Sequence, residues 1–339
     1  MHTPNVSLII PTYNFANYLE GLIASFIEAK ISTIACEIIF VNDGSTDNTF
    51  DLLVDNAKKF PELKIKVHNL NSNQGRFIAR LSGAEIATGK LLFFIDSRIL
   101  LPSNMGLTIQ KLLTTSNCLM GDISINENAS PYSLYWKRTH EFIFRKNFEN
   151  KKTQHFITNE NFNKNLTGTG ALIAPRDIFL KYASTFDSKM VLSDDNALLE
   201  KIVTECPILF DPQFFVYWEP RQTYKSFVKR MFERGPSFVE FHVFKKQGLF
   251  FVIVLIGLSF VTYWLNLLFQ NPILAFKTLI FSFIMLVFST SLFSKSPKEF
   301  FIQVPIHTGT ILYFGIGILW GLIINSFKFI KTKGSMGYK

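Results

Sequence analysis

The chain has 339 residues, of which 48% are hydrophobic and 37 are phenylalanine, and its formal net charge is +9. This length accommodates one soluble domain together with a membrane part. The positive charge is concentrated near and after long apolar stretches, which suits an anionic lipid surface and not nucleic acid. The 3 cysteines, Cys36, Cys118 and Cys206, have no metal or redox spacing, as expected for a reducing cytoplasm.

The N-terminal part alternates predicted strands with predicted helices. Apolar runs of strand length occur at 6–10, 37–41, 64–68 and 91–95, and apolar residues at helical spacing follow the first three of them. This alternation predicts an α/β domain with a mostly parallel sheet and right-handed crossovers.

Polar residues follow three of these strands at the point where each ends. The residues after them are Pro11-Thr12-Tyr13, Asn42-Asp43-Gly44-Ser45 and Asp96-Ser97-Arg98. Open α/β sheets bind ligands at the carboxyl ends of their strands, so we expect these groups to converge on one rim. An alternative for Asp43 and Ser45 is that they only cap the following helix.

Two later motifs also carry candidate functional residues. Thr167-Gly168-Thr169-Gly170 precedes an apolar strand, and its glycines permit close backbone approach, although a simple turn is an equal alternative. Asp194-Asp195 begins a helical pattern. Acids are favoured there by the helix dipole, and this explanation is compatible with a catalytic one.

In chain order, these motifs resemble those of family-2 glycosyltransferases with the GT-A fold. The stretches are VSLIIPTYNFANYL, EIIFVNDGSTDNT, NQGRFIARLSGAEIATGKLLFFIDS, and TGTGALIAP with FDSKMVLSDDNALL, and the resemblance covers residues 1–220. It implies a Rossmann-like catalytic domain and an inverting transfer of sugar from a nucleotide-sugar donor, usually with a divalent metal.

The resemblance also implies a role for individual residues. Pro11, Thr12 and Tyr13 would hold the base and Asp43 the nucleoside, while Gly75 and Arg80 would lie along the nucleotide. Asp96 would be the first acid of the metal-binding motif. Asp194-Asp195 replaces the usual Glu-Asp pair, with Asp195 as general base. Gly168 and Gly170 would lie near the donor sugar and the acceptor.

The sequence departs from the family at Arg98, where a second metal-binding acid is expected. Sugar transfer from a diphosphate needs charge stabilisation on the leaving group and a base for the acceptor hydroxyl. Three explanations are open for a site without the second acid. Asp96 and the diphosphate together can hold Mg²⁺ or Mn²⁺, or Arg98 can itself neutralise the diphosphate. The third explanation is that the site is inactive. We favour the first two jointly, because the rest of the motif set is retained. Arg98 as an outward-pointing surface charge is a further alternative.

The C-terminal part predicts an α-helical transmembrane region. Three hydrophobic segments, 249–269, 273–293 and 307–327, are each about long enough to span a bilayer, and a basic tail follows at 328–339. Three such segments in succession are improbable as buried core helices. Because no cleavable signal segment precedes residue 6, we expect the catalytic domain in the cytoplasm. The basic residues leave the side of the C-terminus open.

The segment 221–248 alternates basic and apolar residues and predicts an interfacial amphipathic helix. Arg230 and Arg234 share a face and would point at a lipid phosphate or the donor diphosphate, or would serve only attraction to anionic lipid. The Gln-x-x-Arg-Trp motif of processive synthases is absent here, which favours transfer of a single sugar.

The sequence therefore predicts a multi-pass enzyme of the inner membrane, of bacterial type, acting in cell-surface polysaccharide or glycolipid synthesis. Its partners would be a nucleotide-sugar donor, a lipid-linked or saccharide acceptor and membrane lipids, with no nucleic acid. Two alternatives stay open: transfer to polyprenyl phosphate itself, and a catalytically inactive membrane protein that binds nucleotide-sugars.

Overall fold

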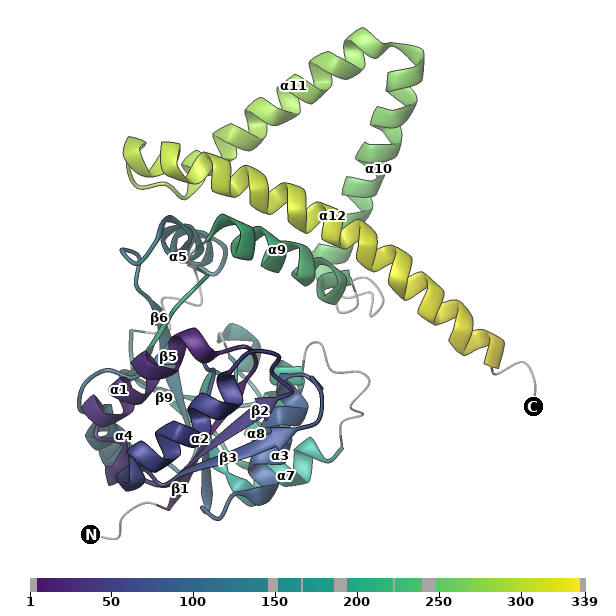
Figure 1. Ribbon diagram of the computed structural model, residues 1–339. Coiled ribbons are helices and arrows are strands. Elements are labelled where there is room, and N and C mark those ends of the chain that lie inside the picture. The colour runs from purple at the N-terminus through teal and green to yellow at the C-terminus, as the bar shows by residue number, and fades with distance from the viewer. Residues whose placement is uncertain are drawn as a thin grey trace. The chain divides into compact units, whose positions relative to one another are not determined.

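The computed structural model describes residues 5–145, 152–165, 167–185, 194–221, 223–239 and 248–335. The chain divides into two compact units (Figure 1). The first comprises Met1–Asn126 and Phe144–Pro220, and the second comprises Glu127–Ile143 and Arg221–Lys339. The segment Glu127–Ile143 therefore belongs with the C-terminal helices, although in sequence it interrupts the first unit.

The described residues of the first unit form a nine-stranded sheet. Its strands are β1 (Val6–Thr12), β2 (Ala35–Asp43), β3 (Ile65–Leu70), β4 (Leu91–Ile95), β5 (Ile99–Leu100), β6 (Leu119–Ile125), β7 (His155–Ile157), β8 (Ala171–Pro175) and β9 (Ile208–Trp218). The order is β3-β2-β1-β4-β8-β6-β9-β5, with β7 paired to β9.

The sheet has a parallel half and a mixed half. Strands β3, β2, β1 and β4 are parallel, as the alternating pattern predicts. Strand β8 is antiparallel to both β4 and β6, whereas β6 is parallel to β9, and β5 and β7 are antiparallel to β9. The mixed half depends on pairing between distant segments, which local periodicity does not encode.

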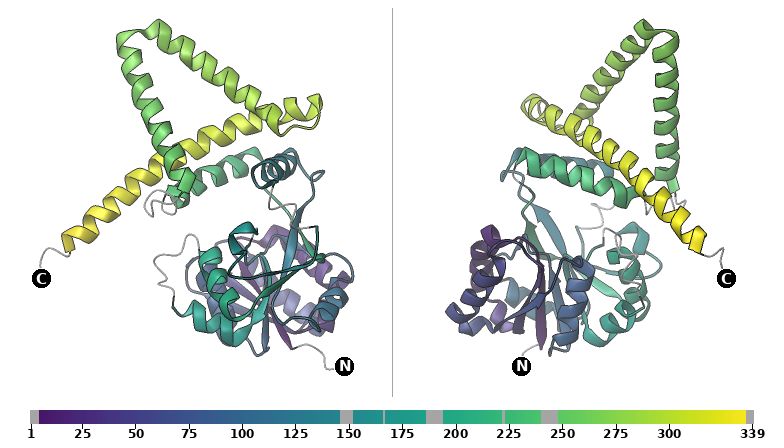
Figure 2. Two further views of the ribbon diagram at one scale, coloured as in Figure 1. Left: turned by 180° about the vertical axis from the view of Figure 1, so that it is seen from behind. Right: turned by 45° about the vertical axis from the view of Figure 1, so that its right-hand side comes forward.

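Helices cover both faces of the sheet (Figure 2). They are α1 (Leu19–Glu28), α2 (Thr49–Lys59), α3 (Arg76–Ile86), α4 (Met105–Leu112), α7 (Arg176–Ala183) and α8 (Asp194–Glu205). Leu8 and Ile10 of β1 pack in the core with α1 and α4, while Ile9 packs in the other core with α3, α7 and α8. Because both faces are buried, the central strands are continuously apolar.

The second unit is helical. Its elements are α5 (Pro131–Ile143), α9 (Tyr224–Phe238), α10 (Gly248–Gln270), α11 (Pro272–Ser289), the 3-10 turn η7 (Thr290–Leu292) and α12 (Pro297–Ser335). Among the described residues, Pro272–Leu292 and Pro297–Ile324 are long and apolar enough to cross a membrane, and Val254–Gln270 is a shorter apolar helix.

The expected hydrophobic segments fall on α10, on α11 with η7, and on α12. The segment 307–327 is the interior of α12, which begins ten residues earlier at Pro297 and continues into the expected basic tail. Two stretches meet the length and hydropathy of a span among the described residues. The first expected segment, 249–269, lies within α10, and its crossing of a membrane stays a prediction. The apolar run in the sequence does not mark the start of α12, because its first turn carries the charged residues Lys298 and Glu299.

Glycines on one face of α12 contact α9 directly. A Cβ atom added to Gly317 would lie 2.3 Å from the carbonyl oxygen of Phe232, and one added to Gly321 would lie 2.6 Å from Cα of Pro236. On α9, a Cβ atom added to Gly235 would lie 2.1 Å from the carbonyl carbon of Gly317. The missing side chains thus let the two backbones touch, as small residues do between membrane helices.

Candidate active site

The parallel order of β2, β1 and β4 brings three predicted site residues to one rim of the sheet. Thr12 ends β1, Asp43 ends β2, and Asp96 directly follows β4. Since the three strands are neighbours and run in the same direction, their carboxyl ends lie side by side.

Asp43 fixes the start of α3. Its side chain is buried, Oδ1 accepts a hydrogen bond from the amide of Gln74 at 2.7 Å, and Oδ2 accepts one from the amide of Gly75 at 2.9 Å. Gly75 has φ +92°, a conformation that glycine adopts at little cost, and α3 begins at the next residue. Neither Asp43 nor Ser45 caps α2, because Ser45 Oγ accepts from the amide of Asn14 at 2.9 Å.

The segment expected to hold the base lies partly inside β1. Pro11 and Thr12 are buried, and the Thr12 hydroxyl donates to the carbonyl of Val41 at 3.1 Å. Of the three predicted residues, Tyr13 is the exposed one, at 47%. The sequence prediction missed Asn14, which has φ 50° and whose Oδ1 accepts from the amide of Thr46 at 2.8 Å. Asn14 thereby joins the loops after β1 and β2.

Asp96 is ion-paired with two arginines of α3. Arg80 is 2% exposed, and its Nη2 lies 2.7 Å from Asp96 Oδ1; Nη1 of Arg76 lies 3.8 Å from Oδ2. Burial opposes ionisation of Asp96, but the charges of Arg80, Arg76 and Arg98 outweigh it and lower the pKa of the carboxyl. The sequence prediction missed Arg76, although its position four residues before Arg80 at the start of a helix places both on one face.

Arg98 is held against the end of β9. Its Nη1 donates to the carbonyl of Glu219 at 3.3 Å, and its guanidinium carbon lies 5.4 Å from the centroid of a Trp218 ring. The amide of Glu219 in turn donates to the carbonyl of Arg98 at 2.9 Å. Arg98 is therefore an anchored, half-buried cation and not an outward-pointing surface charge.

The glycine loop lies between Asp96 and the start of α8. A Cβ atom added to Gly170 would lie 3.6 Å from Asp96 Oδ2, so the loop backbone passes close to the carboxylate; one added to Gly168 would meet nothing within 4 Å. The Thr167 hydroxyl donates to Asn196 Oδ1 at 3.0 Å. Asn196 follows Asp194 and Asp195, which begin α8 and whose side chains lie outside the described part of the structure.

The two predicted arginines of α9 have partners within the second unit. Nη1 of Arg230 lies 3.4 Å from Oε2 of Glu233, and the guanidinium carbon of Arg234 lies 4.4 Å from the centroid of a Trp136 ring. Their expected approach to a diphosphate stays a prediction.

The described residues fit the divalent cation implied by the sequence poorly. None of them forms a group of three or more His, Cys, Asp or Glu side chains that could hold a metal ion. Asp96, the expected ligand, already has its Oδ1 on a buried guanidinium, and both oxygens of Asp43 accept backbone amides. We therefore derive no step through a metal.

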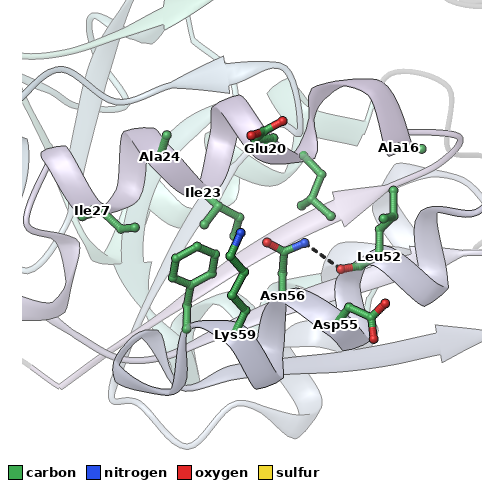
Figure 3. A pocket seen from close by; sticks show the side chains of 11 residues that line it. Ala16, Glu20, Ile23, Ala24, Ile27, Leu52, Asp55, Asn56 and Lys59 are labelled. Carbon is green, nitrogen blue, oxygen red and sulfur yellow. Dashed lines mark hydrogen bonds between the residues drawn. The ribbon is translucent and has the colours of Figure 1, made fainter.

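A cavity of about 480 Å³ lies elsewhere, between α1 and α2 (Figure 3). Its lining mixes apolar side chains such as Ile23 and Phe60 with charged ones such as Glu20 and Lys59. None of the predicted site residues lines it, so it is separate from the rim that carries Asp43 and Asp96.

Residues 7–169 match the family described as glycosyl transferase family 2. The chain is 37% identical over 99 residues to an uncharacterized glycosyltransferase, YibD, of Escherichia coli, covering 28% of this chain and 26% of that protein. It is 39% identical over 93 residues to an undecaprenyl-phosphate 4-deoxy-4-formamido-L-arabinose transferase of Yersinia pestis, covering 27% and 28%. The matched part thus spans about a quarter of the length of these relatives.

A solved structure resembles the fold over most of the chain. It is the mannosyltransferase PcManGT of Pyrobaculum calidifontis in complex with GDP-Man and Mn²⁺, with a TM-score of 0.56 and 16% identity over 94% of this chain and 88% of that one. Together with the matched domain and the Rossmann-like sheet, this supports the interpretation of the sequence motifs. Residues 7–169 are therefore a domain of the glycosyl transferase family 2 type, and the first unit has the GT-A fold.

Proposed function

We propose that the protein is an inverting, non-processive glycosyltransferase. It transfers one sugar from a nucleotide-sugar donor to a lipid-linked or saccharide acceptor at the cytoplasmic face of the inner membrane. The observation that carries this proposal is the cluster at the rim of the family-2 domain, where Asp96 meets the arginines of α3 next to Gly170.

The rim supports binding of an anionic donor. Arginine side chains suit the geometry of phosphate groups, and those of α3 lie beside the loop that Asp43 holds. In this proposal Tyr13 and Asp43 lie along the nucleoside, with Pro11, Thr12 and Gly75 shaping the backbone around them. The family likeness supports the donor class, and the fold neighbour is in complex with GDP-Man.

Asp195 acts as general base in the proposed mechanism, with Asp194 beside it. Asp195 removes the proton of the acceptor hydroxyl, and the oxygen forms a bond to the anomeric carbon. The bond from that carbon to the donor phosphate oxygen breaks, and its electron pair leaves with the nucleoside diphosphate. The hydrogen bond from Thr167 to Asn196 supports this assignment, because it ties the start of α8 to the loop beside Asp96.

The second unit supports a lipid-linked acceptor. We propose a soluble domain at 1–220, an interfacial segment at 221–248 with Arg230 and Arg234, a transmembrane region at 249–327 and a basic tail at 328–339. Two helices of span length support membrane attachment. A relative named as an undecaprenyl-phosphate transferase favours, as an alternative, transfer to polyprenyl phosphate itself.

Release of nucleoside diphosphate in native membranes tests this function. A panel of nucleotide-sugars is supplied with polyprenyl phosphate or lipid-linked saccharides. We expect one donor to give acceptor-dependent release, and Asp195→Asn to lower kcat by at least about 100-fold, the usual share of a general base. Asp55→Asn, an exposed acid on α2, is the matched control and keeps wild-type rates.

The kind of bond in the product distinguishes the two possible acceptors, polyprenyl phosphate and a saccharide. A sugar linked to the lipid phosphate identifies polyprenyl phosphate as acceptor, and a new glycosidic bond identifies a saccharide. Binding of a nucleotide-sugar with no release, under any acceptor, would instead identify an inactive binding protein.

A further inference from the structure

Three guanidinium groups surround one carboxylate at the rim. Arg80 and Arg76 pair with Asp96 at 2.7 and 3.8 Å, and Arg98 follows Asp96 by two residues, with its Nη1 held on the carbonyl of Glu219 at 3.3 Å. Among these four described side chains, three positive charges and one negative charge give a net charge of +2. A bound divalent cation would bring the same charge to a departing diphosphate.

A divalent cation on Asp96 would have to compete with Arg80. The Arg80 side chain is 2% exposed, and its Nη2 already lies on Oδ1 of Asp96. Removing the carboxylate from this pair would break a buried ion pair, which is strongly unfavourable. The incoming cation would also face the charges of Arg76 and Arg98.

The arginines are positioned in advance of any ligand. Arg76 and Arg80 lie one turn apart on α3, whose start Asp43 fixes through the amides of Gln74 and Gly75. Arg98 is anchored by Glu219 and Trp218 at the end of β9. The Arg76 side chain is 53% exposed, so a ligand can reach it. Fixed cations of this kind stabilise charge that develops in a transition state.

We propose that Arg76 and Arg98 bind the donor diphosphate in place of a metal ion, while Arg80 and Asp96 position them. This rests on the proposed function. As the bond between the anomeric carbon and the β-phosphate oxygen breaks, the electron pair stays on that oxygen, and the two guanidinium groups stabilise the added charge. The acceptor proton leaves to the general base, so the step needs no further co-reactant.

Binding of nucleoside diphosphates to the full chain in detergent tests this directly, without turnover. UDP, GDP, CDP, ADP and dTDP are titrated in EDTA and, separately, in Mn²⁺ or Mg²⁺. We expect one of them to bind in EDTA with a Kd within about threefold of its value with metal. Arg76→Gln and Arg98→Gln should each weaken binding about tenfold or more, as loss of a charged hydrogen bond does. Lys58→Gln, which changes an exposed lysine of α2, is the charge control and should bind like wild type.

Arg98→Asp gives the sharpest contrast, because it restores the acidic pair that the family pattern has. This variant should lose binding in EDTA and regain it with Mn²⁺ by about tenfold or more, whereas Arg98→Gln should not respond to metal. Since Arg76 is exposed, Arg76→Gln remains informative if a change at Arg98 disturbs folding.

Two results would overturn the inference: wild-type binding that requires metal, or unchanged affinity in both glutamine variants. Binding in EDTA without sugar transfer would sustain it and refute the proposed function instead. Metal-dependent release with a normal product would refute the inference and leave the proposed function standing.

Discussion

At the scale of single residues, strand β2 carries two buried acids, Asp43 and Glu37, which accept hydrogen bonds at opposite ends of the strand. Asp43 lies at the carboxyl end of β2, where it fixes the loop before α3 through the amides of Gln74 and Gly75. Glu37 lies near the amino end, 3% exposed, where it accepts hydrogen bonds from the hydroxyl of Ser7 at 2.5 Å and the amide of Thr88 at 2.6 Å. Its other oxygen lies 2.5 Å from the Lys66 ammonium. Glu37 is thus a structural acid.

Replacing Glu37 by glutamine should make stability less dependent on pH. Burial opposes ionisation of Glu37, but hydrogen bonds from Lys66, Ser7 and Thr88 prevail and lower its pKa from 4.5 to about 2. A lowered pKa stabilises the fold above pH 4.5, and this contribution fades as the pH falls from 4.5 to about 2. The shift corresponds to about 3 kcal/mol.

Thermal unfolding of wild type and Glu37→Gln between pH 3 and 7 measures this contribution. We expect the variant to have the lower Tm at pH 7 and the difference to shrink in the acidic range. A Tm difference that stays constant over this range would contradict the assignment.

At the scale of elements, α9 and α12 are held together by contact of their backbones. Membrane helices tolerate glycine in general, so a glycine in α12 does not by itself indicate a contact. The structure separates the glycines of α12 by position, because Gly317 and Gly321 contact α9 while a Cβ atom added to Gly315 would meet nothing within 4 Å.

Gly317→Val should therefore separate the two helices, whereas Gly315→Val should not. Both changes replace glycine by valine in the same helix and alter helix propensity equally, so their difference isolates packing. Overpacking of this kind costs about 1–3 kcal/mol. Thermal unfolding in detergent should give a Tm several degrees lower for Gly317→Val, and equal Tm values for the two variants would refute backbone contact as the cause.

At the scale of the whole molecule, Arg138 connects segments that are far apart in sequence. Its Nη2 and Nε lie 2.8 and 3.1 Å from the carboxylate of Glu299 at the start of α12, and its Nη1 lies 2.9 Å from Glu127. The side chain is 7% exposed. This network attaches the segment Glu127–Ile143 to the C-terminal helices, in agreement with the division into two units.

Arg138→Met should loosen α5 from this unit, because it leaves Glu299 without its bidentate partner. Breaking a buried ion pair from one side costs about 3 kcal/mol or more. Faster tryptic cleavage near residues 127–145 in detergent is the expected result. Lys137→Met is the matched control; its partly exposed pair with Glu127 contributes about 1 kcal/mol at most, so cleavage should stay near wild type. Equal cleavage of both variants would assign the attachment to apolar packing alone.

The sequence by itself determined the parallel half of the sheet and the rim residues Asp43 and Asp96. Both follow from local information. Apolar runs specify the strands, and a polar residue that follows a buried strand must lie at the rim formed by the strand ends. Placement of the strand ends was less exact, since β1 continues through the buried Pro11 and Thr12. The end of an apolar run does not always end the strand.

Only the tertiary structure decided which distant groups meet. It placed β8 antiparallel between β4 and β6 and paired Arg76 and Arg80 with Asp96. It also brought together the thiols of Cys118 and Cys206, which are 88 positions apart in the chain, in a hydrogen bond. It also grouped α5 with helices more than 80 residues away. Periodicity records which face of an element is buried, but not which partner buries it. Ion pairs, and the insertion of an antiparallel strand such as β8 between two others, depend on the partner. They can therefore be seen in the folded structure and not in the sequence pattern.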